Sequence, residues 1–487
     1  MAKWLFVMTA LIAVLAGCRT SNKHTPAGKE LSYEAMRDDL HIFKDLLQQG
    51  DPTLNSYISE ERFNRMYDSI YAGLPEYADI YDFYKKLNSV VNEICCSHTD
   101  VLLPDAVYDS LGPMKAFFPY PVQLIEDRLL VNVTGQELPQ GTEIEKVNGR
   151  KVKDLLKEMM FYNTIDGHHR KAQMQSAAEK FSFEYFLQYG QTNTFNLTII
   201  DTTGTRKDVR QDAVSFDEWN QRNDRYKYYY DNTDVDFDFY ISEELKYAYM
   251  RIPTFDFDGA AKENAWEHFC SNSFELLHRK PGIHNLIIDI RENEGGRLRA
   301  VFNLYSYLAK KPFKEYDNVY SRVNRLPFAK YLGKDFYTDE MDGINQELKE
   351  SFVSRGDGYF YSDSLINTWY PDPYAFRGNV FVVTNHNVNS AASYLATLVQ
   401  QSGVGKVVGQ ETAGSSYSSG GFRQVEYVLP NSGIKLYYSF ARLLYSTREP
   451  KNSGHGVLPD YDIGDSYQSF KDNKDNQIKF IIDSLIN

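Results

Sequence analysis

Ser390 stands where a predicted strand delivers the backbone into a predicted helix. The strand is the apolar run Val380–Thr384, and apolar residues three and four positions apart give the following helix one buried face. A serine at a helix start commonly serves only as a cap. The same geometry can place a nucleophile beside the outward-pointing backbone N–H of Ala391, which can stabilise an anion. The segment alone leaves both interpretations open.

The composition is that of an acidic, globular protein with more than one domain. Its 487 residues are long for one domain and predict about two to four. With 42% hydrophobic and 24% charged residues, the protein is globular rather than disordered. A net charge of −13 argues against nucleic acid as a partner and against a polybasic membrane patch.

The N-terminus has the layout of a secretory signal. A positively charged start precedes an apolar run of about a dozen residues, which is too short to span a bilayer. The run ends in LAGC, which resembles the bacterial lipobox. This resemblance implies a signal peptide of residues 1–17 and lipidation of Cys18, followed by a polar tether of residues 18–30. We expect a lipid-anchored protein of the cell envelope, with a periplasm-facing outer-membrane anchor favoured by analogy. An ordinary cleaved signal followed by a chance cysteine is the alternative.

The other cysteines predict neither a disulfide framework nor a metal site. They are Cys95, Cys96 and Cys270, and adjacent cysteines rarely bridge each other because the geometry is strained. Neither a Cys-x-x-Cys nor a His-Glu-x-x-His motif occurs. We therefore expect no metal and no cofactor.

Two segments of different character follow the tether. Residues 31–100 predict an N-terminal helical domain, with helices at Tyr33–Gln49, Ser59–Gly73 and Ile80–Ile94. Residues 115–215 predict a small β domain. Its stretch GTEIEKVNGR resembles part of PDZ domains, and that resemblance implies capture of an extended peptide along a sheet edge. A β domain without a peptide role is the alternative.

The third segment, residues 239–487, alternates strands with helices, which predicts a sheet with helices packed on it. Strands at Gln424–Leu429 and Ile434–Arg442 are expected to complete that sheet. An insertion of about residues 310–374, rich in Tyr, Asp and Asn, would suit a lid or a substrate-facing wall.

Two motifs of this third segment together indicate a family. LIIDIRENEGG, ending at Gly296, is followed about ninety residues later by the Ser390 segment, NVNSAASYLATLVQQSGVGKVVGQETAG. With the PDZ-like stretch before them, these motifs resemble the S41 serine peptidases, which include the C-terminal processing (tail-specific) proteases and the tricorn core. The resemblance implies an α+β / α/β multidomain fold with an N-terminal helical bundle, a PDZ-like β domain and an S41 (ClpP/crotonase-like) α/β catalytic core.

In that setting Ser390 is the expected nucleophile, and a second backbone N–H must approach the substrate carbonyl closely. Gly295 or Gly296 would leave this approach unobstructed and, with Ala391, would form a two-donor oxyanion hole. The alternative for the glycine pair is a tight strand-to-helix turn. Asp289 and Arg291 are expected to brace the loop rather than do chemistry.

The expected general base differs from that of the processing proteases. A gap-free alignment places their catalytic lysine on Ser415, whose hydroxyl cannot serve as a base near neutral pH. The tricorn branch uses a histidine just after a serine, and Ser97-His98 matches that pattern in type and place. The resemblance therefore implies His98 as the base, since imidazole titrates near the working pH.

The resemblance also implies a glutamate that orients His98. Glu449 is best placed, because it precedes a GVLPD stretch similar to the closing motif of the family, and Glu411 is its rival. His455 and His386 compete with His98 for the role of base. His386 is expected to face solvent, as part of the loop before the nucleophile.

Two functions of different kinds follow from these residues. The first is an extracytoplasmic serine endopeptidase that cleaves polypeptides, with polypeptide C-termini among the candidate substrates. The second is a catalytically inactive, peptide-binding lipoprotein of the same fold, suggested by the missing lysine. A hydrolase of non-peptide esters or amides would use the same nucleophile and oxyanion hole, so that class stays open. The sequence gives neither the substrate nor the oligomeric state.

Overall fold

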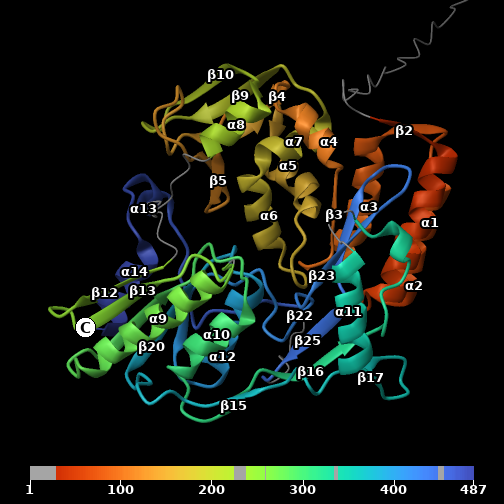
Figure 1. The fold of residues 1–487 in the computed structure, drawn as a ribbon. Coiled ribbons are helices and arrows are strands. Elements are labelled where there is room, and N and C mark those ends of the chain that lie inside the picture. The colour runs from red at the N-terminus through yellow and green to blue at the C-terminus, as the bar shows by residue number, and fades with distance from the viewer. Residues whose placement is uncertain (1–28, 224–236, 258, 334–337, 448–453, 487) are drawn as a thin grey trace, which may run out of the picture.

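The computed structural model describes residues 29–223, 237–257, 259–333, 338–447 and 454–486. Within these ranges the protein forms N-terminal helices at one side, a β-rich middle unit, and a larger core of sheet and helices (Figure 1). Among the described residues, no helix is both long and apolar enough to cross a bilayer. Cys18 and Glu449 lie outside these ranges, so the roles assigned to them remain predictions.

The core is built on a six-stranded sheet whose central strands, β14, β20 and β21, are buried on both faces. Its order is β12-β13-β14-β20-β21-β26, parallel from β13 onwards, with β12 antiparallel at one edge. Because successive side chains of a strand point to opposite faces, Leu286 and Ile288 pack under three helices, α9, α10 and α12, while Ile287 packs against the C-terminal helices. Burial on both faces explains the continuous apolar runs of these strands in the sequence. The bounds are β12 (Asp238–Ser242), β13 (Tyr247–Arg251), β14 (Asn285–Asp289), β20 (Asn379–Thr384), β21 (Lys406–Gly409), β26 (Tyr461–Asp462), α9 (Gly259–His278), α10 (Leu298–Ser306), α12 (Ser390–Gln401), α13 (Tyr467–Lys471), α14 (Asn476–Phe480) and η3 (Ile481–Ile486).

The middle unit contains a second sheet, with the order β10-β9-β7-β6-β5 and β8 paired to β7. Asn148 and Gly149 form the turn between β7 and β8, and their positive φ values of 49° and 79° are those a type I′ hairpin requires. Helix α6 packs against β5, the edge strand. The strands of this unit agree with the small β domain predicted for residues 115–215, while its peptide-binding role stays a prediction. The bounds are β4 (Lys115–Phe117), β5 (Val122–Ile125), β6 (Arg128–Val131), β7 (Glu143–Val147), β8 (Arg150–Lys151), α5 (Val152–Met159), η1 (Met160–Tyr162), α6 (Arg170–Glu179), α7 (Phe181–Tyr189), β9 (Thr194–Ile200), β10 (Arg206–Asp212), β11 (Val214–Ser215) and α8 (Phe216–Asn223).

The N-terminal helices match the predicted ones to within one residue at each end. Each begins after a side chain that accepts a backbone N–H of the first turn, supplied by Ser32, Ser59 and Asp79 in turn. The segment after the third helix forms β3, which pairs with β24 of the C-terminal half. This pairing fixes the N-terminal helices to the core. The bounds are β1 (Glu30–Ser32), α1 (Tyr33–Gly50), α2 (Glu60–Ala72), β2 (Tyr77–Asp79), α3 (Ile80–Ile94), β3 (Asp100–Leu102) and α4 (Asp105–Leu111).

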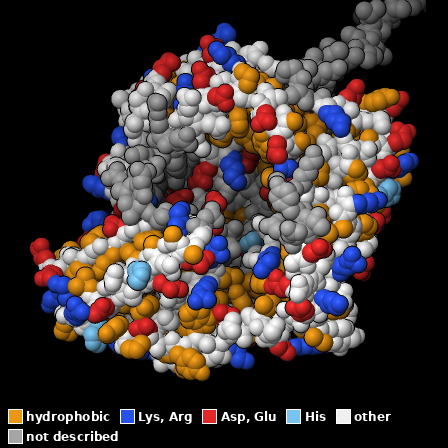
Figure 2. Space-filling model, in the orientation of Figure 1, with side chains coloured by type: hydrophobic (Ala, Val, Ile, Leu, Met, Phe, Trp, Pro, Cys, Tyr) orange, Lys and Arg blue, Asp and Glu red, His pale blue; other side chains and the backbone are white. Residues whose placement is uncertain are grey.

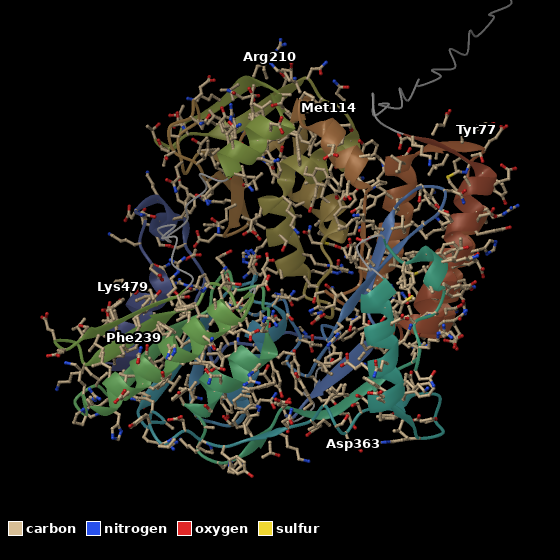
Figure 3. All side chains as sticks on the ribbon, viewed as in Figure 1. Tyr77, Met114, Arg210, Phe239, Asp363 and Lys479 are labelled. Carbon is tan, nitrogen blue, oxygen red and sulfur yellow. The ribbon has the colours of Figure 1, made fainter. Side chains whose placement is uncertain are left out.

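The strands predicted near the C-terminus do not complete the core sheet, so that expectation is wrong. The predicted single strand Ile434–Arg442 is two strands, β24 and β25, which bend apart at Phe440 and enter different sheets. The Ser439 hydroxyl stabilises the bend, because it donates to the Ala441 carbonyl and accepts from the Ala441 N–H. Strand β25 pairs with β16 of the insertion. The insertion lies far from the middle unit, since Asp363 of the insertion and Arg210 of β10 are at opposite ends of the molecule (Figure 3). The bounds are β15 (Phe313–Lys314), β16 (Tyr316–Ser321), η2 (Ala329–Tyr331), α11 (Thr338–Ser351), β17 (Val353–Ser354), β18 (Phe360–Tyr361), β19 (Thr368–Trp369), β22 (Ser418–Ser419), β23 (Gln424–Val428), β24 (Lys435–Ser439) and β25 (Ala441–Tyr445).

Candidate active site

The structure brings Ser390 and His98 into hydrogen-bond contact although 292 positions separate them in the sequence. Ser390 begins α12 at the carboxyl end of β20, and His98 lies in the link between α3 and β3. The Nε2 atom of His98 is 3.0 Å from the Oγ atom of Ser390. At this distance a neutral imidazole can take the proton of the hydroxyl, which is how a serine becomes a strong nucleophile.

The backbone of Ser390 is held in an unusual conformation. Its φ of 48° lies in the left-handed region, which residues other than glycine rarely adopt. The Ser390 N–H donates to the side chain of Asn389 at 2.7 Å, and Gly414 packs so closely that an added Cβ would lie 2.7 Å from the Ser390 nitrogen. Strain of this kind persists where the surroundings impose it, commonly at active sites. These contacts therefore fix the direction of the Ser390 side chain.

A serine and a buried aspartate extend the line of contacts behind His98. The Nδ1 atom of His98 is 3.2 Å from Oγ of Ser97, and that hydroxyl donates to Asp166 at 3.0 Å. Asp166 also accepts the N–H groups of Ser97 at 2.8 Å and Ser415 at 3.0 Å, and it is only 4% exposed. With the Nδ1 proton directed at Ser97, the Nε2 lone pair faces Ser390.

Asp166 was not predicted from the sequence. The residue comes from a loop between η1 and α6 of the middle unit, in a region assigned only to peptide binding. No motif in the sequence marks it, and its role is visible only once the three regions of the protein are brought together.

The surroundings of His98 favour the neutral imidazole. Burial lowers the pKa of His98 below its ordinary value of 6.5, and the charge of Asp166 opposes part of that effect. A base must be unprotonated before the reaction, so a lowered pKa keeps it ready at neutral pH. Gln424 further fixes the segment, because its side-chain amide donates to the His98 carbonyl at 3.2 Å.

Two backbone N–H groups near Ser390 are candidate donors to a substrate carbonyl. The Ala391 N–H belongs to the first turn of α12, where helix geometry supplies no acceptor. Of the two predicted glycines, Gly295 already donates its N–H to the Asn293 side chain at 2.9 Å. The bridge between Gly296 and Phe255 uses the Gly295 carbonyl and the Arg297 N–H. The N–H of Gly296 itself is not used there, and Gly296 lines the cavity that contains Ser390. The geometry therefore favours Ala391 and Gly296 as the two donors.

Gly295 has a different role, which is close approach. Its φ is 112°, and an added Cβ would lie 2.7 Å from the Ser390 Cβ. Asp289 and Arg291 brace this loop, as expected, with an ion pair at 2.6 Å, and Arg291 makes a second one with Asp475 at 2.6 Å. Burial alone would raise the pKa of Asp289, but Arg291 holds it below its ordinary value.

The competing residues lie elsewhere. Glu411 contacts His455 at 3.0 Å and His169 at 3.3 Å, and no contact joins it to His98 among the described residues. The expectation that His386 faces solvent is wrong, since it is 3% exposed and contacts Glu179 of α6 at 3.0 Å. Burial lowers the pKa of His386, but Glu179 outweighs this and the net shift is upward. An internal carboxylate partner, invisible in the sequence, explains the difference.

Comparison with known proteins identifies the family. Residues 246–463 match the model of peptidase family S41. The chain contains an S41 family peptidase domain. A serine peptidase with a mixed helix-and-sheet, multidomain fold, as predicted from the sequence, is thereby confirmed. No curated protein matches it by sequence.

Solved structures share the fold of this S41 peptidase. Mature CPAF complexed with lactacystin aligns with a TM-score of 0.62 at 17% identity, over 93% of this chain and 98% of that one. A CPAF mutant aligns with a TM-score of 0.65 at 16% identity, over 93% and 96%. The photosystem II D1 C-terminal processing protease covers 93% and 97% at 13% identity, but its TM-score of 0.43 is too low to carry weight. The CPAF similarity supports a common fold only.

One group of side chains in the described part of the S41 peptidase has the spacing of a metal site, namely Cys96, His98 and Asp166. A cysteine binds metals as the thiolate. Burial raises the pKa of the Cys96 thiol to about 12, which keeps it protonated at neutral pH. His98 and Asp166 are already engaged by Ser390 and Ser97. The structure therefore gives these three side chains contacts other than those to a metal ion.

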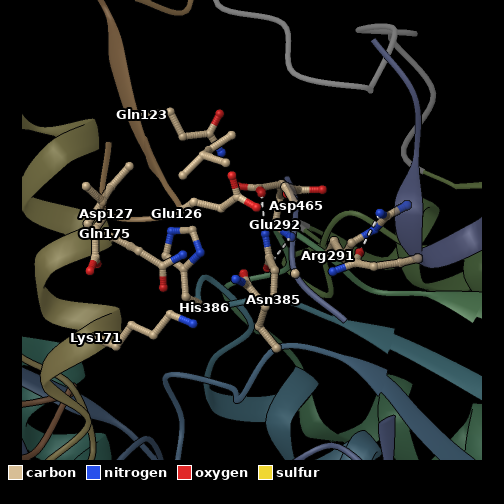
Figure 4. Close-up of a pocket in the computed structure, with 15 residues that line it drawn as sticks. Gln123, Glu126, Asp127, Lys171, Gln175, Arg291, Glu292, Asn385, His386 and Asp465 are labelled. Carbon is tan, nitrogen blue, oxygen red and sulfur yellow. Dashed lines mark hydrogen bonds between the residues drawn. The ribbon is translucent and has the colours of Figure 1, made fainter. Parts of the chain in front are cut away.

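The surface of the S41 peptidase is hollowed between the middle unit and the core (Figure 2). Two cavities lie in this part of the protein. The active-site cavity, of about 430 Å³, contains Ser390, His98 and Gly296. A second cavity of about 380 Å³ lies between β5, α6 and the loop before Ser390, with Lys171 and His386 at its wall (Figure 4). This cavity borders β5, the edge strand beside which a PDZ-like peptide site is predicted.

Gly421 leaves room for the histidine, which gives a steric test of the site. An added Cβ at Gly421 would lie 2.3 Å from Nε2 of His98. Gly421→Ala should therefore turn the imidazole ring away from Ser390 and lower kcat/KM by about 100-fold, with little change in Tm because the ring can rotate. Gly282→Ala is the matched control, since its added Cβ meets no atom within 4 Å. Equal activity of the two variants would contradict the assignment of His98.

Proposed function

We propose that this S41 peptidase is an endopeptidase in which Ser390 attacks the peptide carbonyl and His98 is the general base. The observation that supports the proposal is the 3.0 Å contact between Ser390 Oγ and His98 Nε2. The other nitrogen of the imidazole is engaged by Ser97, so the base has its lone pair on the side of the nucleophile. Asp166 contacts His98 through the Ser97 hydroxyl, and in this proposal it orients the imidazole. The role of Glu449 stays a prediction.

The reaction follows from this arrangement in two stages. Ser390 Oγ forms a bond to the carbonyl carbon while its proton passes to Nε2 of His98, and the Ala391 and Gly296 N–H groups stabilise the oxyanion. The carbon–nitrogen bond then breaks as His98 returns the proton to the leaving amine. A water molecule next attacks the acyl carbon and gives a proton to His98. The bond between that carbon and Ser390 Oγ then breaks as His98 returns the proton to Oγ, which releases the second product and restores both side chains.

Covalent labelling tests the proposal directly. A peptidyl phosphonate should label Ser390 of the wild-type protein, and peptide mapping should find the adduct on that residue. Ser390→Ala should not be labelled. Absence of any adduct on wild-type protein under conditions in which it is folded would favour the peptide-binding, inactive alternative.

The pH dependence follows from the lowered pKa of His98. The neutral imidazole is the active form, so kcat/KM should rise with pH along an acid limb and then level off. Because burial lowers the pKa of His98, the midpoint of that limb should lie below 6.5. Rates measured between about pH 4 and pH 9 with a fixed peptide substrate give the midpoint. A midpoint above about 7 would contradict the buried, neutral base.

The location of the protein in the cell is a further part of the proposal. The lipobox-like sequence before Cys18 supports a lipid anchor on the outside of the cytoplasmic compartment. Metabolic labelling with a radioactive fatty acid should mark the wild-type protein and not Cys18→Ser. Equal labelling of both would reject the anchor.

A further inference from the structure

A third cavity, here called the acyl-side cavity, adjoins the active site. It has a volume of about 360 Å³ and shares Gly296, Gly421 and Phe422 with the active-site cavity. Gly296 is exposed, so its backbone forms an open edge between the two spaces. A substrate held at Ser390 can therefore extend a side chain across Gly296 into this cavity.

The walls of the acyl-side cavity are mainly apolar. Trp266 and Phe257 lie with ring centroids 5.3 Å apart, and both are almost fully buried. The cavity is also lined by Leu298, Ala300, Tyr316 and Phe422. Aromatic and aliphatic walls of this kind gain free energy when an apolar group replaces water in the cavity.

The charged side chains at the mouth of this cavity neutralise each other. Arg297 pairs with Glu263 at 3.1 Å and also donates to the Phe257 carbonyl at 2.7 Å. Arg299 pairs with Glu267 at 3.8 Å. Among the described residues that line the cavity, each cation lies beside a carboxylate, so these residues offer no unpaired charge to hold a lysine, arginine or acidic side chain.

The orientation of the substrate decides which side chain enters. The leaving nitrogen must lie toward His98, because it receives the proton held on Nε2. The acyl residue lies on the other side, beside the oxyanion donors, and Gly296 is both one of these donors and the edge of the acyl-side cavity. Arg297 follows Gly296 and precedes α10, and the first turn of α10 forms part of the cavity wall.

We propose that the acyl-side cavity binds the side chain of the residue whose carbonyl is attacked, and that it selects large apolar and aromatic residues there. This inference rests on the proposed function, because it assumes acylation of Ser390. It adds a substrate class: polypeptides cleaved after residues such as Phe, Leu, Met or Tyr, rather than after small or charged ones.

Labelling rates with matched probes test this selection. Four peptidyl phosphonates that differ only in the acyl-side residue, Phe, Ala, Lys or Asp, would be compared by the rate at which each modifies Ser390. The Phe probe should react on the order of 100-fold faster than the Ala probe, and the Lys and Asp probes more slowly than Phe. Similar labelling rates for all four probes, or the fastest labelling with a charged probe, would overturn the proposed selection of apolar residues but leave the proposed function standing. Labelling by none of the four would reject the proposed function.

Narrowing the cavity tests its position. Leu298 is half-buried at the wall, so Leu298→Trp should lower the Phe-to-Ala rate ratio by about tenfold while the Ala probe still reacts. Leu245→Trp, the same exchange at an exposed residue in the β12–β13 turn, should keep the wild-type ratio. If Leu298→Trp does not fold, Phe422→Ala removes a half-buried wall residue and should lower the ratio too. An unchanged ratio in the folded wall variant would place the selecting site elsewhere.

Discussion

Ser390→Ala and His98→Ala should each lower kcat/KM by about a million-fold, and the double variant should be no slower than either one. The reason is that the hydroxyl and the imidazole act as one unit through their 3.0 Å contact, so loss of either group removes the same step. Peptide hydrolysis by the three purified variants, with Tm to confirm folding, measures this. The weak activity left in each should be that of the oxyanion donors and substrate binding alone.

Ser393→Ala is the control for this experiment. Ser393 lies one turn along α12 and is fully buried, and its hydroxyl donates to the Val388 carbonyl at 3.0 Å. Its loss should cost about 1 kcal/mol of unfolding free energy and leave the chemistry intact. Inactivation by Ser393→Ala in a folded protein, or survival of activity in Ser390→Ala, would move the nucleophile away from Ser390.

Asp166→Asn should lower kcat by about 100- to 1000-fold with a smaller change in KM. The carboxylate holds the Ser97 hydroxyl, which in turn holds His98, and its charge stabilises the imidazolium that forms during the reaction. Because that charge also raises the pKa of His98, its removal should shift the acid limb of the pH profile to lower pH. Steady-state kinetics over a pH series would show both effects.

Ser97→Ala separates positioning by Asp166 from its structural contacts. This variant removes the hydroxyl between His98 and Asp166 but keeps the bonds from the Ser97 and Ser415 N–H groups to the carboxylate. It should lower kcat about tenfold, less than Asp166→Asn. A purely structural Asp166 would instead lower Tm without moving the acid limb.

The elements that carry the site were predictable because local pattern determines them. Helix Ile80–Ile94 has the same bounds in prediction and structure, since a cap and a regular apolar face define it. Ser390 likewise begins α12, as the change from an apolar strand to an amphipathic helix indicated. The contact between Ser390 and His98 was expected only through resemblance to a family, because pairing of β3 with β24 brings them together and no local pattern encodes it.

The rest depended on packing that the sequence does not show. Asp166 lies in a loop with no motif, and only docking of the middle unit directs it at Ser97. His386 was assigned to solvent because its partner, Glu179, lies 207 positions away. The bend at Phe440 was missed because apolar alternation continues through it, while Ser439 bonds redirect the backbone.

Ser390, His98 and Asp166 come from three different regions of the described protein. The nucleophile belongs to the core, His98 to the N-terminal helical region, and Asp166 to the middle unit. In a newly made or partly unfolded copy these three side chains are still apart, so the proposed catalytic site is not yet assembled. The protein should therefore be inactive until its three regions have docked. Proteolytic activity should appear only with the last docking step of folding.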